Sequence, residues 1–415
     1  MRKGKLAESA LNRSVLRQLH MGADSWQRYR GADCAVLGNL TLFTTVNEVP
    51  GCEDDPGSLI VAAANGLAAG GAQPEAFLVS AMLPVDYEEP RLRADMQRLA
   101  AVAERVCAHD VDTLRAGGNA HTAESEDTLH ASEKEYATDV VDTLRAGGNA
   151  HTAESADALR ASEEKYAMDT VDTSRAGGNV HTAGDADASH PGSSAHTPHS
   201  SRILGGHTQV SDAVTRPVYS VTGIGRADPG TCRVEVRLQP GDALIVTEAI
   251  ALAGTAALAA RHEEALLSRY PFSLVDRAKQ FGTLASVGET ARAITHFGTA
   301  AVHDLSQGGM FNALWEMAER ADVGLEVDLK KIPIRQETVE ICEYFDINPY
   351  YLYSAGSLLV GTAQGEALVS CLAAQGIRAT VIGSVTADRA RVIRNGEDIR
   401  YLDRPQPDEW YRTQR

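Results

Sequence analysis

The chain has 415 residues, of which 43% are hydrophobic, and a formal net charge of −17 at pH 7. This length suits two domains, and the hydrophobic content is enough for buried cores. The acidic balance argues against a general nucleic-acid binder, which needs a basic face for phosphates. No apolar run reaches the roughly 18 residues that predict a membrane span.

The cysteine pattern indicates a reducing compartment. The spacing of the six cysteines includes no CxxC pair and no other zinc-like arrangement. We therefore expect reduced, mostly structural thiols in a cytoplasmic protein. The N-terminal residues 1–19 carry basic side chains without a continuous apolar core, so we expect no signal peptide there.

The first part of the chain alternates strand-like and helix-like segments. The predicted elements are strands over 40–46 and 76–83, helices over 58–74 and 90–108, and, further on, the segment 203–210 and a strand over 217–225. This alternation predicts an α/β or α+β layered fold. The helix over 58–74 is rich in alanine and glycine, which permits close packing on a sheet or against a ligand.

An internal repeat interrupts this pattern. The fifteen residues that begin at Val111 recur unchanged from Val141, and a looser copy begins at Val171. Without it, the helix over 90–108 would lead directly into residue 202, so residues 111–201 are interpreted as an insertion. Its composition is too polar to offset the entropy of ordering, which favours a mobile surface excursion. A stacked array of the three units is the alternative.

Histidines are concentrated in this insertion, and they allow two interpretations. Metal capture is one, and solvated histidines in a polar repeat are the other. The copies lie about 30 residues apart rather than at the three- or four-residue spacing of metal ligands, so the second interpretation is favoured.

The second half contains a glycine-rich turn. A strand over 243–247 leads to a helix that opens at Gly254, and a later strand ends at His303 and Asp304. Gly308 and Gly309 then precede a helix predicted from Met310, with Ser306 as a candidate cap. A strand, a glycine turn and a helix N-terminus form an anion-binding arrangement, although glycines at such turns also serve turn geometry alone.

Five segments together resemble the aminoimidazole-ribonucleotide (AIR) synthetase superfamily, which includes thiamine-monophosphate kinase, selenophosphate synthetase and the hydrogenase maturation factor HypE. They are residues 31–37, 64–74, 203–210, 303–309 and 323–362. The C-terminal half is most similar to HypE and to hydrogenase maturation factor-like proteins. The resemblance covers nearly all of the chain outside the insertion.

The resemblance implies a two-domain α/β (α+β) fold. The N-terminal domain would be residues 1–110 with 202–226, the C-terminal domain 227–402, and the tail 403–415. Two N-terminal domains would pair into a barrel and make a homodimer. ATP would lie in a cleft between domains, held through Mg²⁺, and catalysis would act by positioning and charge neutralisation.

The resemblance also implies which residues contact the nucleotide. The cofactor-binding candidates are Asp33, Asn65, Gly205, Gly206, His207, Thr208, Asp304, Gln307, Gly308 and Gly309, and Asp33 is the candidate metal ligand. Lys5 could reach a phosphate from the N-terminus or be part of a solvated basic tail.

Three departures from the superfamily pattern weaken the expected metal site. Ala32, Val46 and Gly66 stand where the superfamily carries acidic residues. Mg²⁺ on a triphosphate needs hard oxygen ligands, so Asp33 alone would hold it weakly. Glu48, Asp54 or Asp55 could substitute.

The C-terminus departs from HypE as well. HypE has a C-terminal cysteine that accepts a carbamoyl group, whereas this chain ends in DEWYRTQR, and its last cysteine, Cys371, lies in a predicted helix. A thiolate nucleophile is needed for that chemistry, so HypE activity itself is not expected. His207 could contact phosphate or stabilise its turn, His303 could be catalytic or orient its turn, and Trp315 is expected in the core.

Three functions remain open. The chain could be an ATP-using enzyme or maturation factor with a partly degenerate metal site, acting on an unidentified small molecule or protein carboxamide. It could instead be a non-catalytic homodimer that binds a nucleotide or a partner. A third possibility is an accessory that contacts a metalloenzyme or a HypF-like carbamoyl donor during maturation.

Overall fold

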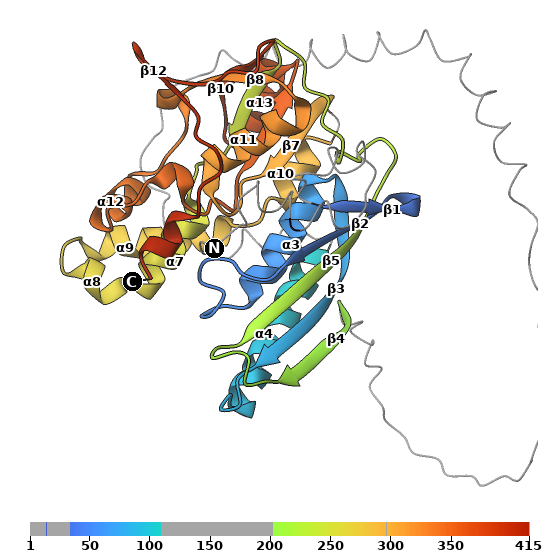
Figure 1. Cartoon of the computed structure of the whole chain (residues 1–415), viewed down its shortest axis with the longest axis vertical. Helices are drawn as coiled ribbons and strands as arrows, with labels where there is room; N and C mark the ends of the chain where they lie inside the picture. The colour runs from blue at the N-terminus through green and yellow to red at the C-terminus, as the bar shows by residue number, and fades with distance from the viewer. Residues whose placement is uncertain (1–13, 15–33, 109–201, 296, 415) are drawn as a thin grey trace, which may run out of the picture. The chain divides into compact units, whose positions relative to one another are not determined.

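The computed structural model describes residues 14, 34–108, 202–295 and 297–414. These residues form one compact unit. The repeat insertion, Lys5, Ala32 and Asp33 lie outside them. The predicted domain boundaries therefore stay predictions, but the α/β class is confirmed by two sheets with helices packed on them (Figure 1).

The first sheet has five strands in the order β1-β2-β5-β3-β4. Its strands are β1 (Ala35–Leu37), β2 (Thr41–Val46), β3 (Ala72–Leu83), β4 (Ile203–Val210) and β5 (Val218–Ala227), with the 3-10 turn η2 (Gly38–Leu40) between β1 and β2. All neighbours are antiparallel except β3 and β4, which run parallel. Strand β4 is therefore an edge strand of this sheet.

Helices α3 (Gly57–Ala69) and α4 (Glu89–Cys107) cover one face of the first sheet (Figure 1). The side chains beneath them alternate along β3 and include Phe77, Val79 and Ala81. Helix α3 ends earlier than the predicted residue 74, because Gly71 turns the chain with φ +88°. A Cβ there would lie 1.7 Å from the carbonyl oxygen of Thr231, so only glycine fits.

The opposite face of the first sheet is open within the described part of the chain. Leu78 and Met82 of β3 and Val218 of β5 are 38%, 36% and 40% exposed on it, and Met82 is paired directly with Val218. Hydrophobic side chains that gather on an uncovered sheet face are typical of a surface that another protein covers.

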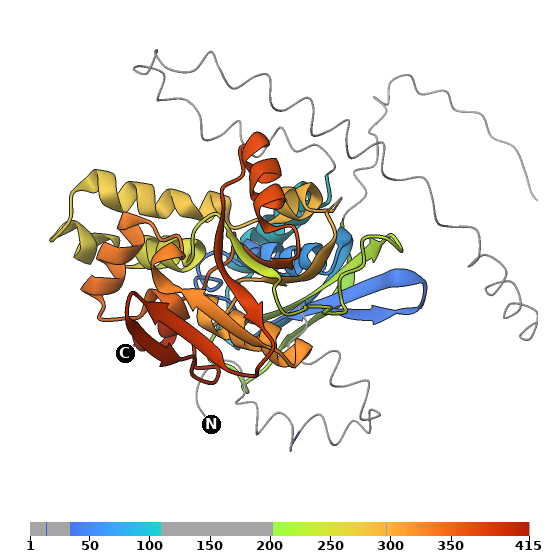
Figure 2. The ribbon, with the colours of Figure 1, turned by 90° about the horizontal axis from the view of Figure 1, so that it is seen from above.

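The second sheet has seven strands in the order β12-β11-β8-β10-β6-β9-β7. Its strands are β6 (Ala243–Thr247), β7 (Thr299–Asp304), β8 (Gly324–Asp328), β9 (Leu358–Thr362), β10 (Ala379–Thr386), β11 (Arg391–Asn395) and β12 (Asp398–Tyr401). The hairpin of β11 and β12, dark red in Figures 1 and 2, forms one end of this order. Strand β10 carries a bulge between Val381 and Gly383.

Helices pack on both faces of the second sheet. Helix α11 (Gly309–Ala321) shares one core with strands β6, β8 and β10. Helices α10 (Gly288–Ala293) and α13 (Gly365–Ala374) share another core with β7 and β9, which the end of α3 also enters. Both faces of the central strands are thus buried, which explains why β6 and β9 are almost wholly apolar.

A third layer of helices forms its own cluster. It contains α7 (Leu252–Arg261), α8 (Glu263–Leu267), α9 (Phe272–Gln280) and α12 (Gln336–Tyr344). Four 3-10 turns complete the fold, namely η3 (Phe281–Leu284), η4 (Leu329–Lys331), η5 (Pro349–Tyr351) and η6 (Glu409–Arg412). Trp410 of η6 is buried in this cluster, so the C-terminal segment is part of the folded body.

Smaller features of the fold concern the thiols, the cap of α11 and membrane-spanning helices. All six cysteines are free thiols, and Cys371 lies in α13 as predicted. Ser306 does not cap α11 with its side chain, because Gly308 takes the N-cap position; Ser306 instead accepts a hydrogen bond from the Gly309 amide through its carbonyl, at 3.1 Å. Among the residues the structure describes, no helix is both long and apolar enough to cross a membrane.

Candidate functional site

The glycine turn between β7 and α11 forms as predicted. Gly308 and Gly309 have φ values of +82° and +63°, which a residue with a side chain rarely adopts. A Cβ on Gly309 would lie 2.6 Å from the Leu352 carbonyl oxygen, so the turn is pressed against the segment that precedes β9. Asp304, at the end of β7, is buried beside this turn.

The turn is in contact with the N-terminal half of the chain. The Gln307 side-chain amide donates a short hydrogen bond to the carbonyl oxygen of Glu48, which lies in the loop after β2. The predicted residues Asp304, Gln307, Gly308 and Gly309 lie together at this turn, and Gln307 contacts the loop over residues 47–53.

The amide groups at this turn already have acceptors from the chain itself. The Gly308 amide donates to Asp408 Oδ2 at 2.7 Å, and Asp408 is only 3% exposed. The amides of Tyr353 and Trp410 donate to the other oxygen of that carboxylate, at 3.3 and 2.9 Å. The anion position that the sequence assigns to a phosphate is thus held by a carboxylate of the C-terminal segment.

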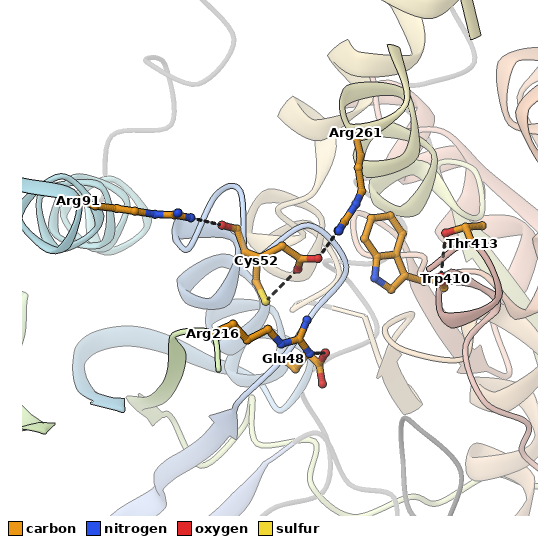
Figure 3. A network of polar contacts seen from close by, with 8 residues as sticks. Glu48, Cys52, Arg91, Arg216, Arg261, Trp410 and Thr413 are labelled. Carbon is orange, nitrogen blue, oxygen red and sulfur yellow. Dashed lines mark hydrogen bonds and ion pairs between the residues drawn. The ribbon is translucent and has the colours of Figure 1, made fainter. Parts of the chain in front are cut away.

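The loop over residues 47–53 is held by two ion pairs. Glu53 pairs closely with Arg261 of α7. The Arg261 guanidinium lies 5.5 Å from the Trp410 ring centre, and Figure 3 shows the two side chains next to each other. Glu48 pairs with Arg216 at 3.1 Å. Burial raises the pKa of Glu53 and Arg261 lowers it, with a net value below the ordinary range, so the carboxylate stays ionised.

A small cavity of about 120 Å³ opens beside this loop. Cys52 and Arg216 line it, together with Asp95 of α4 and Tyr219 of β5. Asp95 Oδ2 accepts hydrogen bonds from the hydroxyls of Tyr219, at 2.7 Å, and Tyr87. The wall therefore contains one ion pair and one carboxylate held by two phenols.

Titratable groups are crowded where the loop, the glycine turn and the C-terminal segment meet. Burial raises the pKa of the Cys52 thiol to about 11, so the thiol is neutral at physiological pH and is a poor nucleophile. Burial also raises the pKa of Tyr353, with the nearby charges of Asp304 and Asp408 adding to it. Asp408 itself has a pKa raised to about 6, mainly by burial. Perturbed groups gathered in this way are typical of functional sites, although structural networks produce them too.

Asn65, a predicted nucleotide contact, makes its side-chain hydrogen bonds to the segment before α10. Its side chain is buried in α3, where its Nδ2 donates to the Ala285 carbonyl at 2.7 Å and its Oδ1 accepts from the Val287 amide at 3.0 Å. These bonds tie α3 to the segment before α10. Asn65 is therefore engaged in holding the two halves of the chain together.

The Gly205–Thr208 motif lies on strand β4. Gly206 must be glycine, because at φ +148° a Cβ would lie 1.7 Å from the Val79 carbonyl oxygen. Gly205, His207 and Thr208 are exposed along the edge of the first sheet, and His207 Nε2 lies 3.3 Å from Gln209 Oε1.

The metal prediction rests on a residue outside the described part. Asp33, the candidate ligand, precedes its first continuous segment. Within residues 34–108, 202–295 and 297–414, no group of three or more His, Cys, Asp or Glu side chains is placed to hold a metal ion. Val46 ends β2 and Gly66 lies buried in α3, so these positions add no oxygen ligand.

Several residues at this junction were missed by the sequence reasoning. Asp408 is the main one, with Trp410, Tyr353, Cys52 and Arg261 around it. An aspartate before a short helix is a recognisable cap, and Asp408 does cap η6. That signal is local, however, and it says nothing about contact with a turn a hundred residues earlier.

His303 and Trp315 take structural positions. His303 is buried, with Nδ1 at 2.9 Å from the Asp304 carbonyl oxygen and Nε2 at 3.1 Å from Glu316 of α11. It therefore orients the turn, which agrees with one of the two interpretations of the sequence. Trp315 is half-buried rather than enclosed, and the Arg391 guanidinium lies 3.9 Å from its ring centre.

Residues 239–395 match the AIR synthase related protein, C-terminal domain. Among curated relatives, the chain is similar to a carbamoyl dehydratase HypE of Rhodobacter capsulatus, with 32% identity over 46% of this chain and 56% of that protein. A putative hydrogenase expression/formation protein of Methanocaldococcus jannaschii is 30% identical over 46% of this chain and 56% of that protein. The chain thus spans about half the length of the curated relatives it matches.

Solved structures share the fold over most of the chain. HypE in a HypE–HypF complex has a TM-score of 0.57 at 16% identity, covering 95% of this chain and 100% of that one. HypE in complex with ATP has a TM-score of 0.56 at 14% identity, covering 98% and 97%. ThiL in complex with AMPPCP and TMP has a TM-score of 0.55 at 16% identity, covering 96% and 97%. At these identities the likeness concerns the fold.

Proposed function

Because the chain is an AIR synthase-related, HypE-like protein, we propose that it binds ATP and acts as an ATP-dependent enzyme or maturation factor on a substrate still to be identified. The observation that carries this proposal is the fold shared, over nearly the whole chain, with HypE in complex with ATP and with ThiL in complex with AMPPCP. Positioning and charge neutralisation would be its main contributions to phosphoryl chemistry.

The phosphates would lie along Gly205–Thr208 of β4 rather than at the glycine turn. This strand is a sheet edge with exposed backbone and two exposed polar side chains, His207 and Thr208. Amide groups on an open edge provide anion contacts without any rearrangement of the fold. The other predicted donor, at Gly308, is already bonded to Asp408.

Mg²⁺ would be held weakly in this protein. Asp33 is the one carboxylate that the resemblance retains, and the residues described beyond it offer no ligand cluster. When bound, Mg²⁺ would neutralise phosphate charge. The chain's own residues would contribute hydrogen bonds to the phosphates and orientation of the nucleotide.

A homodimer formed through the open face of the first sheet is part of the proposal. The apolar side chains of Leu78, Met82 and Val218 lie on that face, and strand β4 lies at its edge. Pairing two such faces would bury these apolar side chains. Light scattering of Leu78→Glu and Met82→Glu variants tests this: we expect monomers, and dimers that persist would contradict it.

A second function is favoured by one specific observation. Ala32, Val46 and Gly66 replace acidic residues that the resemblance leads one to expect. This favours a non-catalytic homodimer that binds a nucleotide or a partner protein. The solved HypE–HypF complex makes a maturation protein a candidate partner.

Calorimetric titration of the full chain with ATP, with and without Mg²⁺, followed by an assay for ADP or AMP release, distinguishes these functions. Mg²⁺-dependent binding with turnover supports the enzyme. Binding without turnover supports the non-catalytic alternative, and no binding contradicts the nucleotide proposal. The Ala32→Asp/Val46→Asp variant should bind Mg·ATP more tightly, with the isosteric Val46→Thr as the matched control.

A further inference from the structure

The C-terminal segment makes two polar attachments to the first turn of α11. Asp408 is the first, through its bond from the Gly308 amide. The second is a reciprocal pair in which Asn312 Nδ2 donates to the Gln406 carbonyl at 2.8 Å and Asn312 Oδ1 accepts from the Gln406 amide at 3.0 Å. Asn312 lies directly over the turn, since its Nδ2 would be 1.8 Å from a Cβ on Gly308.

Apolar burial fixes the segment in this position. Trp410 is 3% exposed and packs in the cluster formed by α7, α9 and α12, with Arg261 beside its ring. The turn η6 continues into Thr413, whose hydroxyl donates to the Trp410 carbonyl at 2.9 Å. Burying a large aromatic side chain stabilises the segment strongly, so the carboxylate is held by a well-anchored part of the chain.

The occupied position is the one that phosphate takes at other helix N-termini. Unpaired amides and the helix dipole favour a negative charge there. Asp408 supplies that charge, it bonds three amides from three separate segments, and burial separates it from water. A phosphate at the same amides would have to displace the carboxylate, because two anions in contact repel strongly in a buried site.

We propose that the C-terminal segment is an internal ligand of the glycine turn: Asp408 takes the anion position at the N-terminus of α11 and closes it to phosphate-bearing ligands. The turn positions Asp304 and Gln307 without itself binding phosphate. An anion reaches Gly308 only when Asp408 is removed or displaced.

This inference goes beyond the proposed function and is tested independently of it. Its probe is inorganic phosphate rather than a nucleotide, and its readout is local to residues 303–312. If the protein does not bind ATP, the proposal about Asp408 is unaffected. If Asp408 does not exclude phosphate, the proposal of ATP binding at β4 is unaffected.

The first measurement is phosphate binding by the full chain and by Asp408→Ala at pH 7.5. The Asp408→Ala variant should bind inorganic phosphate about tenfold more tightly than the wild type, because a charge-assisted amide bond becomes available. Asp403→Asn, which removes an exposed carboxylate of the same segment, is the matched control and should behave as wild type. Equal affinities for wild type and Asp408→Ala would overturn the proposal.

The second measurement is hydrogen exchange of the amides over residues 303–312. In the wild type these amides should exchange slowly, and phosphate should not change them. In Asp408→Ala they should exchange faster, and phosphate should restore protection. Phosphate-dependent protection in the wild type would contradict the inference. If Asp408→Ala does not fold, Asp408→Asn replaces it, because asparagine has the same shape without the charge. If the amides over residues 303–312 exchanged in Asp408→Asn as they do in the wild type, the proposal would also be contradicted.

Discussion

The two glycine motifs of this protein look alike in sequence and differ in what surrounds them. Around Gly308, three amides are bonded to one buried carboxylate of the same chain. Around Gly205, the residues lie exposed on an edge strand. A glycine turn shows that backbone can come close to a ligand, but only the packing around it decides whether the donors are free.

The two motifs should differ most in how much the free energy of unfolding falls when a glycine is replaced by alanine. Gly309→Ala places a Cβ 2.6 Å from a backbone oxygen at a positive φ, and we expect it to lower the free energy of unfolding by about 4 kcal/mol. A Cβ on Gly205 would contact only Leu78 Cδ2, at 3.9 Å. Gly205→Ala should therefore change the free energy of unfolding by less than about 0.5 kcal/mol. Urea unfolding of both variants measures this, and similar losses would remove the distinction.

The next effect is the pH dependence of stability that arises from Asp408, which occupies the glycine turn at Gly308. The pKa of Asp408 is raised to about 6 from an ordinary value of 3.8, so the folded chain holds this proton more tightly than the unfolded chain. The protonated Asp408 carboxyl therefore adds about 3 kcal/mol to the free energy of unfolding. This contribution is fully present below about pH 4 and is lost as the pH rises towards 6.

Urea unfolding of the wild type and Asp408→Asn between pH 4 and pH 7.5 isolates this contribution, because the other groups cancel in the difference. The wild type should lose stability relative to the variant as the pH rises. A difference that stays constant over this range, or that has the opposite sign, would show that Asp408 titrates normally in the folded chain.

Changes in the exposed motif Gly205–Thr208 should alter the affinity for ATP rather than the free energy of unfolding. His207→Ala should weaken ATP binding about tenfold, which corresponds to about 1.4 kcal/mol, and it should leave unfolding unchanged because the side chain is exposed. Titration calorimetry measures this, with Asp212→Ala, which changes an exposed side chain just beyond β4, as control. Unchanged ATP affinity in His207→Ala would place the phosphates elsewhere.

The smallest effect sharpens the contrast between the buried junction and the surface. Arg261→Ala removes the ion pair with Glu53 and the contact with the Trp410 ring. It should lower the free energy of unfolding by about 1 kcal/mol. Arg93→Ala breaks a pair with Glu89 on the exposed face of α4, and should cost less than about 0.5 kcal/mol. Thermal unfolding of both variants compares them, and equal losses would mean that Arg261 does not anchor the C-terminal segment.

Local sequence signals determined much of the fold. The predicted strands over 40–46 and 243–247 match β2 and β6, and the helix over 90–108 matches α4 within a residue. These elements depend on periodicity and on glycine or proline at their ends, which are properties of neighbouring residues. The contiguous part of the site, from Asp304 to Gly309, was predictable for the same reason.

The sequence by itself thus determined the layered α/β class and the two glycine motifs. Only the tertiary structure decided that Asn65 joins α3 to the segment before α10, and that Asp408 fills the anion position at Gly308. Both outcomes depend on contacts between residues separated by 100 or more positions in the chain. No local pattern records such contacts, because they follow from how whole layers pack and from which buried polar groups must find partners.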